Sequence, residues 1–553
     1  MKVYLVKVNV FIAAVTLLGL FFSATANANL VELHQSYLEP AESTLQFQDA
    51  SLLLQDSLNL GKEPTAEILL DENTQLLEIP LRPRALSPAA FPTPLDQTSA
   101  IANQATYDQL KALGCQDESR VGTADCEGVT FIVWNNVRAL VHTSNQLLGS
   151  PTESTTFSLD IDAVALNQAL RWTSSEELAA QDTMTDNFVT GQHSSLSYRL
   201  SALRYGTKGF MLNSNSNKTN KKLSSHQSAR PTGINAGDET GEAWSRLGGF
   251  LDVNYTYGDQ RASEYENAFD MHGYEISTGL DYRLDDHWVV GGILGYISET
   301  VDFDPERSVS DGTVDMDGLS LTPFVLYQTG DWFYSASAAY QKVEFNTDRN
   351  IRYLSNNASV ASIDTVAKSN NNSDSLSASL SGGNSYFVTD NLVIEQSVSL
   401  NYRDVSIDEI EETDINNDGF NLLVKERSFQ SFESVVGVKM QYTLSNQYGV
   451  FMPYIDTQYY AEHKGGRRYI DAVYADVSDE LTQDAHFILQ TNTVDSDYKI
   501  YGLGVAAVIR GAQQTTLDSA ANGGIQAYIN VREIKDVGGY SQKIFSAGMR
   551  YEL

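Results

Sequence analysis

The second half of the sequence alternates apolar and polar residues, and this pattern restricts most strongly what the chain can fold into. In residues 274–284, for example, Tyr274 and Ile276 flank Glu275, and the alternation continues to Leu284, so an extended strand carries its apolar side chains on one face. The pattern recurs in twelve segments of about ten or more residues, the length of a tilted transmembrane strand. They begin near Leu247, Gly273, Trp288, Val314, Asp331, Ser373, Leu392, Arg427, Tyr448, Tyr498, Gly524 and Tyr540.

The connections between these segments alternate in length. Short connections lie at 285–287, 329–330, 389–390 and 445–447, and long polar ones lie near 258–271, 302–313, 346–372, 404–420 and 461–497. Residues 511–523 break the alternation, because a short turn is expected there. Bacterial outer-membrane barrels have short periplasmic turns and long extracellular loops. Since no run after residue 28 approaches 18 apolar residues, the pattern predicts an all-β transmembrane antiparallel barrel of about 12 strands.

Aromatic residues recur near the ends of the predicted strands, as expected for girdles at the two membrane interfaces, although strands are enriched in tyrosine in any case. They are Tyr255, Tyr257, Tyr282, Tyr296, Tyr327, Trp332, Tyr340, Tyr402, Tyr442, Tyr454, Tyr528 and Tyr551. The last strand is apolar at every second position. Its apolar face comprises Phe545, Ala547, Met549, Tyr551 and Leu553.

The first half of the chain divides by composition. Residues 1–28 combine a basic end, an apolar run and a small-residue cleavage site, which predicts a removable signal peptide; a retained anchor is the alternative. Residues 29–128 are expected to be irregular, and residues 129–210 have apolar residues at helical spacing, which predicts a mainly α-helical region. Residues 211–243 are polar and predict a linker, followed by the barrel at 244–553.

The two cysteines of the chain, Cys115 and Cys126, lie close together in the region before the predicted barrel. In an exported protein they are candidates for a disulfide, with two free thiols as the alternative. The formal charge of −34 argues against binding of nucleic acid, which requires a basic surface. The acids are spread between the apolar segments, which is typical of solvated loops.

Residues 244–553 resemble the twelve-stranded autotransporter domain of type V secretion. The similarity lies in Leu247-Gly248-Gly249-Phe250, Gly279-Leu280-Asp281-Tyr282-Arg283, the run of residues 290–296 and the closing Arg550-Tyr551-Glu552-Leu553. The last strand also resembles the C-terminal signal that the outer-membrane assembly machinery recognises.

The resemblance implies a bacterial outer-membrane protein whose barrel anchors or translocates an N-terminal passenger to the cell surface, with a helix in the barrel lumen. A helix is about 10–12 Å wide, which a twelve-stranded barrel can hold. Residues 185–205 are the candidate for this helix, and residues 239–245 are the alternative. The implied partners are membrane lipid, the barrel assembly machinery and periplasmic chaperones.

Motifs for catalysis are mostly missing from the sequence, so no enzymatic activity and no cofactor are expected. His193 lies beside two serines, but adjacency in sequence is not catalytic geometry. Residues 414–425 copy the first half of a calcium-binding loop, with Lys425 where a glutamate is required, so a polar loop is favoured over a weak calcium site. His272 and His463 lie near strand ends on the long-loop side.

Three hypotheses follow for the function. The first is an autotransporter-type protein without enzymatic activity, the second is a pore or transport barrel with a periplasmic helical domain, and the third is a hydrolase with a site at the barrel rim around His272 and His463. The strands alone do not separate the first two hypotheses.

Overall fold

The computed structural model of the protein describes residues 65–68, 77–80, 93–115, 126–149, 154–206, 247–285, 287–303, 311–414, 416–446, 449–466, 468–492, 497–510, 525–537 and 539–552. The chain divides into two units, Met1–Arg82 and Pro83–Leu553. In the first unit, β1 (Thr65–Ile68) pairs antiparallel with β2 (Leu77–Pro80). The predicted signal peptide, the linker at 211–243 and residues 511–523 lie outside the described residues. Among the described helices, none has the length and apolarity needed to cross a bilayer.

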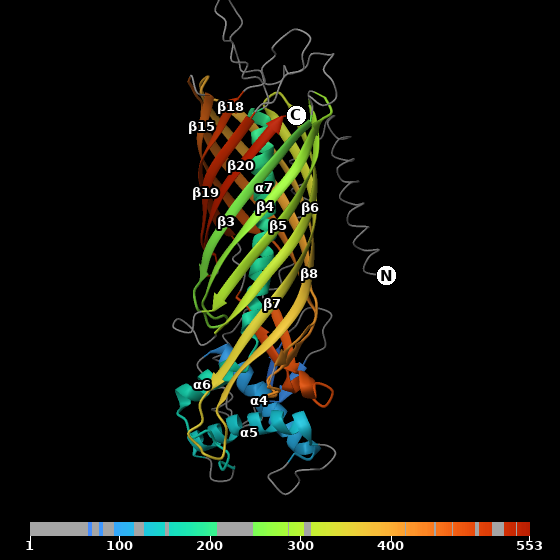
Figure 1. The fold of residues 1–553 in the computed structure, drawn as a ribbon, viewed down its shortest axis with the longest axis vertical. Coiled ribbons are helices and arrows are strands. Elements are labelled where there is room, and N and C mark those ends of the chain that lie inside the picture. The colour runs from blue at the N-terminus through green and yellow to red at the C-terminus, as the bar shows by residue number, and fades with distance from the viewer. Residues whose placement is uncertain are drawn as a thin grey trace, which may run out of the picture. The chain divides into compact units, whose positions relative to one another are not determined.

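Twelve antiparallel strands of the second unit form a closed barrel, which confirms the predicted fold class (Figure 1). Closure comes from two pairings, that of the last strand with the first and that of β8 with β9. The strands are β3 (Leu247–Gln260), β4 (Phe269–Arg283), β5 (Trp288–Phe303), β6 (Gly312–Thr329), β7 (Trp332–Tyr353), β8 (Ile363–Phe387), β9 (Leu392–Ile407), β13 (Arg427–Tyr442), β15 (Gly449–Glu462), β18 (Asp497–Arg510), β19 (Ile525–Val537) and β20 (Tyr540–Glu552).

The alternation in the sequence separates the two faces of the barrel wall. On β4, Tyr274 and Ile276 are exposed on the outer face, whereas Glu275 is buried in the lumen. Two residues assigned to the aromatic girdles point the other way: Tyr454 is only 4% exposed on the lumen face of β15, and Tyr528 contacts the lumen-facing side of Gly548. Around both tyrosines, apolar residues occupy consecutive positions in the sequence, so the alternation does not show which face of the strand carries each ring.

The strands β7 and β8 are longer than the sequence predicted. Their pairing continues to Tyr353 and Ile363, so β8 begins ten residues before Ser373 and much of the predicted loop 346–372 is a hairpin. Residues 368–375 are mostly asparagine, serine and aspartate. They have no apolar alternation, because this part of the hairpin lies beyond the membrane-facing band and needs no lipid-facing side chains.

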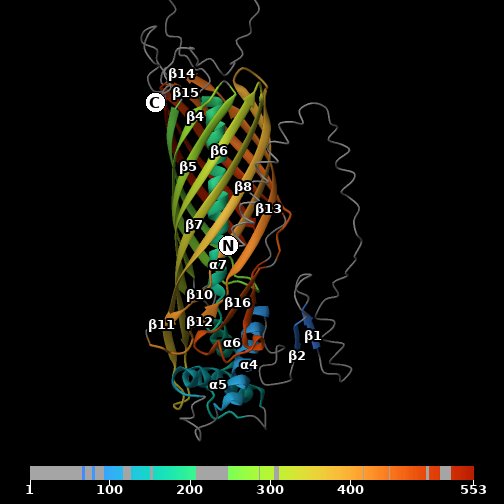
Figure 2. The same cartoon turned by 90° about the vertical axis from the view of Figure 1, so that its right-hand side faces the viewer.

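A single long helix, α7 (Ala179–Gly206), runs through the barrel interior (Figures 1 and 2). This confirms residues 185–205 as the lumen helix. Its apolar side packs against the wall formed by the first barrel strands: Phe188 belongs to one buried cluster with Met271 of β4 and Ile297 of β5. Farther along the helix from the cap, Leu196 clusters with aromatic side chains of β3 and β6.

Three further helices lie at one end of the barrel. They are α4 (Pro94–Leu113), α5 (Gly128–Leu148) and α6 (Ala163–Trp172), and the short η2 (Glu176–Leu178) leads from them into α7. We call α4, α5, α6 and η2 the helical cap. Helix α4 corrects the expectation that residues 29–128 are irregular. Its prolines suggested an extended chain, but Pro94 occupies the first helical turn and Thr93 and Asp96 form a capping box, where proline is favourable.

The long loops at the same end form a second sheet between the barrel and the cap (Figure 2). It contains β10 (Ile410–Glu411), β12 (Leu422–Val424), β16 (Tyr469–Tyr474) and β17 (Phe487–Gln490), and we call it the loop sheet. One buried core includes side chains of the cap, such as Trp134 and Leu140, and of the loop sheet, such as Tyr474 and Phe487. The remaining short elements are β11 (Thr413–Asp414), β14 (Leu444–Asn446), η4 (Ala475–Val477) and η5 (Gln483–Ala485).

The two ends of the barrel therefore differ. Strand β3 starts and strand β20 finishes at the end with the short turns. There, Gly248 pairs with Glu552 and Leu247 pairs with Tyr282. The helical cap lies at the opposite end, with the long loops (Figure 1). In outer-membrane barrels the long loops are extracellular.

Candidate functional site

The mouth of the barrel next to the cap contains a set of buried ion pairs that hold the lumen helix. Asp182 and Asp186 are four residues apart on α7 and so project from the same face. Asp182 pairs with Arg427 of β13 at 3.1 Å, and Asp186 pairs with Arg468, just before β16, at 2.7 Å. Arg403 of β9 lies 3.4 Å from Asp186. We call these five residues the arginine clamp.

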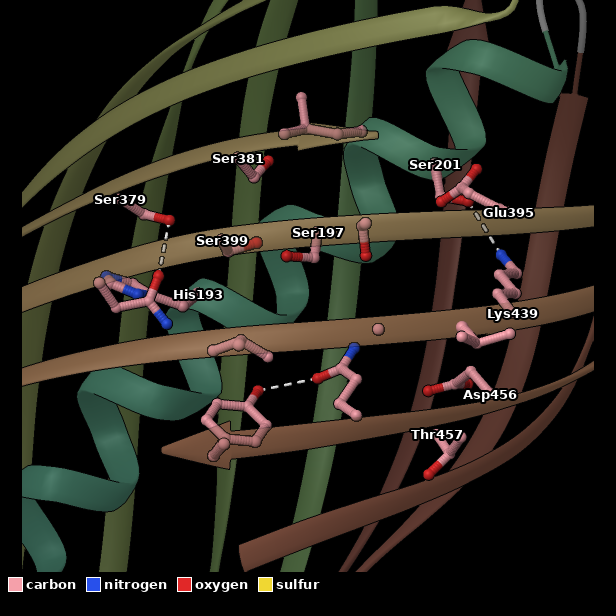
Figure 3. A pocket seen from close by; sticks show the side chains of 18 of the residues that line it. His193, Ser197, Ser201, Ser379, Ser381, Glu395, Ser399, Lys439, Asp456 and Thr457 are labelled. Atoms are coloured by element: carbon pink, nitrogen blue, oxygen red, sulfur yellow. Dashed lines mark hydrogen bonds between the residues drawn. The ribbon is translucent and has the colours of Figure 1, made fainter. Parts of the chain in front are cut away.

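The same face of α7 remains polar beyond the clamp, farther from the cap. Thr190 accepts a hydrogen bond of 3.2 Å from the guanidinium of Arg403, and Ser201 accepts one of 2.8 Å from Lys439 of β13. His193 lies between them. His193, Ser201 and Lys439, with the serines of β8 and β9, line a polar cavity between the helix and the wall (Figure 3).

The opposite face of α7 is packed tightly against β3, β4 and β5. Asn254 donates hydrogen bonds to Ser195 at 3.0 Å and to Glu275 at 3.2 Å, and Gln192 also bonds to Glu275. Gly295 of β5 allows this approach, because an added Cβ would lie 2.6 Å from the amide nitrogen of Gln192. The helix is therefore packed closely against this side of the lumen, while on the other side polar contacts hold it beside a cavity.

A buried arginine joins the wall, the loops and the cap. Arg349 of β7 forms two parallel hydrogen bonds to Glu412, of 2.9 and 2.5 Å, and both side chains are 1% exposed. The same guanidinium donates to the backbone carbonyls of Trp172 at the end of α6 and of Phe420. Such paired geometry is the strongest form of an arginine–carboxylate contact. Neither this pair nor the clamp was predicted from the sequence.

The protruding β7–β8 hairpin also contacts the cap. Asn356 donates its backbone N–H to the carbonyl of Leu159 at 2.8 Å, and the Asn357 side chain donates to the carbonyl of Ser158 at 2.7 Å. On the other side, the Tyr474 hydroxyl of β16 donates to Asn103 of α4 at 2.8 Å. The cap is thus bonded to the hairpin and to the loop sheet.

The predicted cysteine pair is present in the cap. Cys115 and Cys126 form a disulfide with Cα atoms 5.2 Å apart, and both are nearly fully buried. The bond connects the end of α4 to the start of α5. It closes a loop with a sequence separation of 11 residues.

Among the ionisable groups of the cap and loops, Glu176 and Asp471 have pKa values shifted in opposite directions. Burial, reinforced by the neighbouring Glu177 carboxylate, raises the pKa of Glu176 well above its ordinary value. Burial also tends to raise the pKa of Asp471, but hydrogen bonds from His486 and Lys425 outweigh this effect and lower it. Its surroundings therefore favour the protonated form of Glu176, whereas those of Asp471 favour the carboxylate form.

The residues considered for catalysis are not assembled into one site. His272 on the outer face of β4 lies 3.6 Å from Asp302 of β5, and His463 accepts or donates a hydrogen bond with Ser434 at 2.8 Å. The strands β4 and β15 are separated by β3, β20, β19 and β18 in the barrel. His193 bonds to Ser377 at 3.0 Å inside the lumen.

The calcium-like segment forms an ordinary loop against the cap. The Asp414 carboxylate accepts the backbone N–H of Asp418 at 3.1 Å, and the Asp418 carbonyl accepts a hydrogen bond from Asn136 of α5. Lys425 forms an ion pair with Asp471 at 2.9 Å. Within the described part of the chain, no group of three or more potential metal-binding side chains occurs.

The last strand places its alternate apolar residues on the lipid-facing surface. Phe545, Met549 and Tyr551 are 42–52% exposed on the outer face of β20, and Ala547 lies between them on the same face. Leu553 lies outside the described residues. On the other face, Arg550 pairs with Asp281 at 2.9 Å in the lumen.

Comparisons with known proteins agree with this architecture. The model of the autotransporter beta-domain family matches residues 249–542, just over half of the chain. Similar solved structures include the translocator domain of the autotransporter NalP from Neisseria meningitidis, with 12% identity, 57% of this chain and 90% of that chain covered, and a TM-score of 0.40. No curated protein matches the chain.

Two other solved structures are also similar to the chain. The beta domain of the Bordetella autotransporter Brka has 12% identity, with 56% of this chain and 100% of that chain covered and a TM-score of 0.36. A FadL homologue from Pseudomonas aeruginosa has 10% identity, with 56% of this chain and 90% of that chain covered and a TM-score of 0.31.

Proposed function

Because the chain belongs to the autotransporter family and its barrel is an outer-membrane transport and anchor domain, we propose that its helical cap is a short passenger that stays on the cell surface. In this proposal the chain segment before α7 crosses the barrel, α7 remains in the lumen, and the cap folds on the long loops. The protein then presents the cap outside the cell without releasing it.

The observation that carries this proposal is the core that the cap shares with the loop sheet. Trp134 and Leu140 of α5 are buried in one cluster with Tyr474 and Phe487 of the loops. Burial of large apolar side chains contributes about 1.5–3 kcal/mol each. A passenger destined for release would have its own core, whereas this one is completed by the barrel's loops.

Retention is also supported by the connection through the lumen. The arginine clamp holds α7 by two carboxylates and three arginines from β9, β13 and the loop before β16. Breaking a buried ion pair by removing one partner costs about 3–5 kcal/mol. Withdrawal of the helix would break several of these pairs at once.

Protease treatment of intact cells tests the topology. We expect cleavage within the cap or its loops and protection of an epitope tag inserted at residues 389–390, in a predicted periplasmic turn. The same tag must become accessible after permeabilisation. Full protection of residues 93–178 on intact cells, with cleavage after permeabilisation, would place the cap in the periplasm and refute the proposal.

For assembly, we propose that the outer face of β20 is read by the barrel assembly machinery after delivery by periplasmic chaperones. The support is the uninterrupted apolar face that contains Phe545 and Tyr551, at the end of the chain's final strand. Replacing both by serine should lower the amount of folded barrel in the outer membrane. As a control, Lys543→Ser changes an already polar position on the same face and should have little effect.

We further propose that the protein has no enzymatic activity. The support is that His272 lies on β4 and His463 directly after β15, a strand that is not adjacent to β4, together with the use of each histidine in a local contact. A peptidase assay on purified protein would refute this proposal if it detected cleavage that disappears in His272→Ala or His463→Ala.

A further inference from the structure

A cavity of about 130 Å³ lies at the arginine clamp, between α7 and the barrel wall. On the helix, its lining residues include Ala179, Thr183, Asp186 and Thr190, which recur at helical spacing and therefore share one face. Residues of β3, β9, β13, β18, β19 and β20 and of the long loops line the other side. The cavity therefore lies at the mouth of the barrel, where helix, wall and loops meet.

The lining of this cavity contains more carboxylates than cations. Its charged residues are Asp182, Asp186, Glu266, Glu433, Arg403 and Arg468. Four carboxylates face two guanidinium groups, so two negative charges are in excess. Charged residues directly behind the lining do not alter this excess, because Arg427 pairs with Asp182, while Glu462 lies 4.0 Å from Arg403. An excess of buried charge is unfavourable unless a partner of opposite charge is present.

The two aspartates of α7 are balanced by the two arginines of the lining. Asp186 lies 2.7 Å from Arg468 and 3.4 Å from Arg403. Asp182 lies 3.7 Å from Arg468. The excess negative charge therefore resides on the two glutamates.

These glutamates lie at opposite ends of the cavity. Glu433 of β13 accepts a hydrogen bond from the Tyr498 hydroxyl at 3.1 Å and also lines a smaller cavity deeper in the lumen. Glu266 belongs to the loop between β3 and β4 and accepts two hydrogen bonds from Asn492. Burial, together with the nearby Asp182 carboxylate, raises the pKa of Glu266, whereas a cation beside it would favour the ionised form. Each end therefore offers one carboxylate to a cationic group.

The wall beside these glutamates includes aliphatic and aromatic side chains. Ile534 of β19 and the rings of Tyr498 and Tyr540 line it. Tyr498 stacks on Tyr460 with ring centroids 4.7 Å apart. The Tyr540 hydroxyl accepts a hydrogen bond from Asn187 at 3.0 Å, so both rings are held in position. Such rings pack against a hydrocarbon chain and also attract ammonium groups.

The volume of the cavity limits the size of a ligand. A cavity of about 150 Å³ holds benzene, so this one accommodates a molecule of about six non-hydrogen atoms. We propose that the cavity binds a short aliphatic diamine as a dication, with one ammonium group at Glu433, the other at Glu266, and the carbon chain against the apolar wall. Putrescine has this size and charge. Because the ligand contacts both α7 and the wall, it binds only while the helix is in place and strengthens its retention.

Calorimetric titration of the purified full chain in detergent micelles tests the proposal with three ligands of equal length. They are putrescine, pentylamine, in which a methyl group replaces one amine, and butanediol with hydroxyl groups in place of both amines. We expect pentylamine to bind about tenfold and the diol about a hundredfold more weakly than putrescine, because each lost ammonium group removes a charge-assisted hydrogen bond. These measurements need no variant. Absence of putrescine binding, or equal affinity for the diol, would overturn the proposal.

Two variants locate the binding site. Glu266→Gln should weaken putrescine binding about tenfold, because one carboxylate is lost. Glu264 is an exposed glutamate of the same loop outside the cavity lining, so Glu264→Gln is the matched control and should not change the affinity. Thr183→Phe fills the cavity without removing a charge and should abolish binding. Unchanged affinity in Glu266→Gln or Thr183→Phe, or equal weakening by Glu264→Gln, would show that putrescine binds elsewhere and refute the assignment.

Binding of a diamine is a function separate from surface display of the cap. If protease treatment places the cap in the periplasm, the titrations still decide whether the cavity binds a diamine. If putrescine does not bind, surface display of the cap is unaffected.

Discussion

Arg349 on the barrel wall and Glu412 in the loop between β9 and β13 bind each other through two parallel hydrogen bonds, and both are buried where the cap meets the barrel. The remaining donors of Arg349 reach the last carbonyl of α6 and the carbonyl of Phe420. One guanidinium therefore connects a barrel strand, a long loop and the helical cap. This arrangement makes it the most direct point at which docking of the cap can be tested.

We predict that Arg349→Met destabilises the docked cap by about 3–5 kcal/mol, because it leaves Glu412 buried without its partner. Tryptophan fluorescence in urea measures the change when Trp244, Trp288 and Trp332 are replaced by phenylalanine, so that only Trp134 and Trp172 of the cap report. Arg352→Met is the matched control on the same strand. Arg352 pairs with Asp364 in a half-exposed position, where such a pair contributes less than about 1 kcal/mol.

The double variant Arg349→Met/Glu412→Met separates pairing from packing. Removing both charges eliminates the unpaired carboxylate, so part of the lost stability should return. A double variant as unstable as Arg349→Met alone would mean that the contacts to the Trp172 and Phe420 carbonyls, and not the ion pair, hold the cap.

We predict that reduction of the Cys115–Cys126 disulfide lowers the free energy of unfolding of the cap by about 3 kcal/mol, from the entropy of a loop of this size. The barrel transition should not change, because the bond lies entirely within the cap. Urea unfolding with and without reductant measures both transitions, and Cys115→Ser/Cys126→Ser should reproduce the reduced protein. Equal stability of the oxidised and reduced forms would contradict the prediction.

The buried Glu176 predicts a pH dependence of cap stability. Its pKa in the folded protein is raised, first by burial and then by Glu177, so the folded cap binds its proton more tightly than the unfolded cap does. The contribution to stability is fully present below the unfolded pKa of about 4.3. It is lost as the pH rises through the folded pKa.

Replacement of Glu176 by glutamine removes this dependence. Glu176→Gln should therefore stabilise the cap above about pH 4.3, with a gain that grows with pH, and should flatten the pH profile of its urea midpoint. The exposed Glu127→Gln in the same cap serves as the control. A glutamine variant that is less stable than the natural protein at pH 7 would sink the explanation.

The lipid-facing side of β20 gives a prediction about the membrane. Met549→Arg places a charge on the outer face of the strand, two residues before the girdle residue Tyr551, and should destabilise the barrel by about 1–2 kcal/mol, less than the cost at the bilayer midplane. Lys543→Arg, on the same face near the long-loop end, should have little effect because a charge is already present there. Reversible unfolding in lipid vesicles measures the difference, and equal stability of the two variants would argue against a membrane-embedded Met549.

The sequence predicted the barrel because its signal is repeated along the chain. Each strand needs lipid-facing apolar residues at every second position, so the same alternating pattern recurs in twelve segments. The lumen helix was also recognisable from the spacing of residues such as Leu196 and Leu200. The extended part of the β7–β8 hairpin was missed because strands beyond the membrane band are free of this constraint.

The contacts that fix the cap could not be predicted in the same way. Arg349 and Glu412 are 63 residues apart, and Asp182 and Arg427 are 245 apart, so nothing in their local sequence indicates that they meet. The acids on α7 did offer a signal, since Asp182 and Asp186 share a helix face that would otherwise be apolar in a buried helix. Their partners depend on the closure of the barrel, which brings β9 and β13 to that face.

The core shared by the cap and the loop sheet has an evolutionary consequence. Trp134 in one part of the chain and Phe487 in another are buried in the same cluster, so a change of size at either position has to be matched across the interface. A helical cap of this kind cannot be exchanged between barrels without its loop sheet. On a foreign barrel, the helices would lack the loop-sheet side chains that complete their core. The cap and the loops are therefore expected to be inherited together.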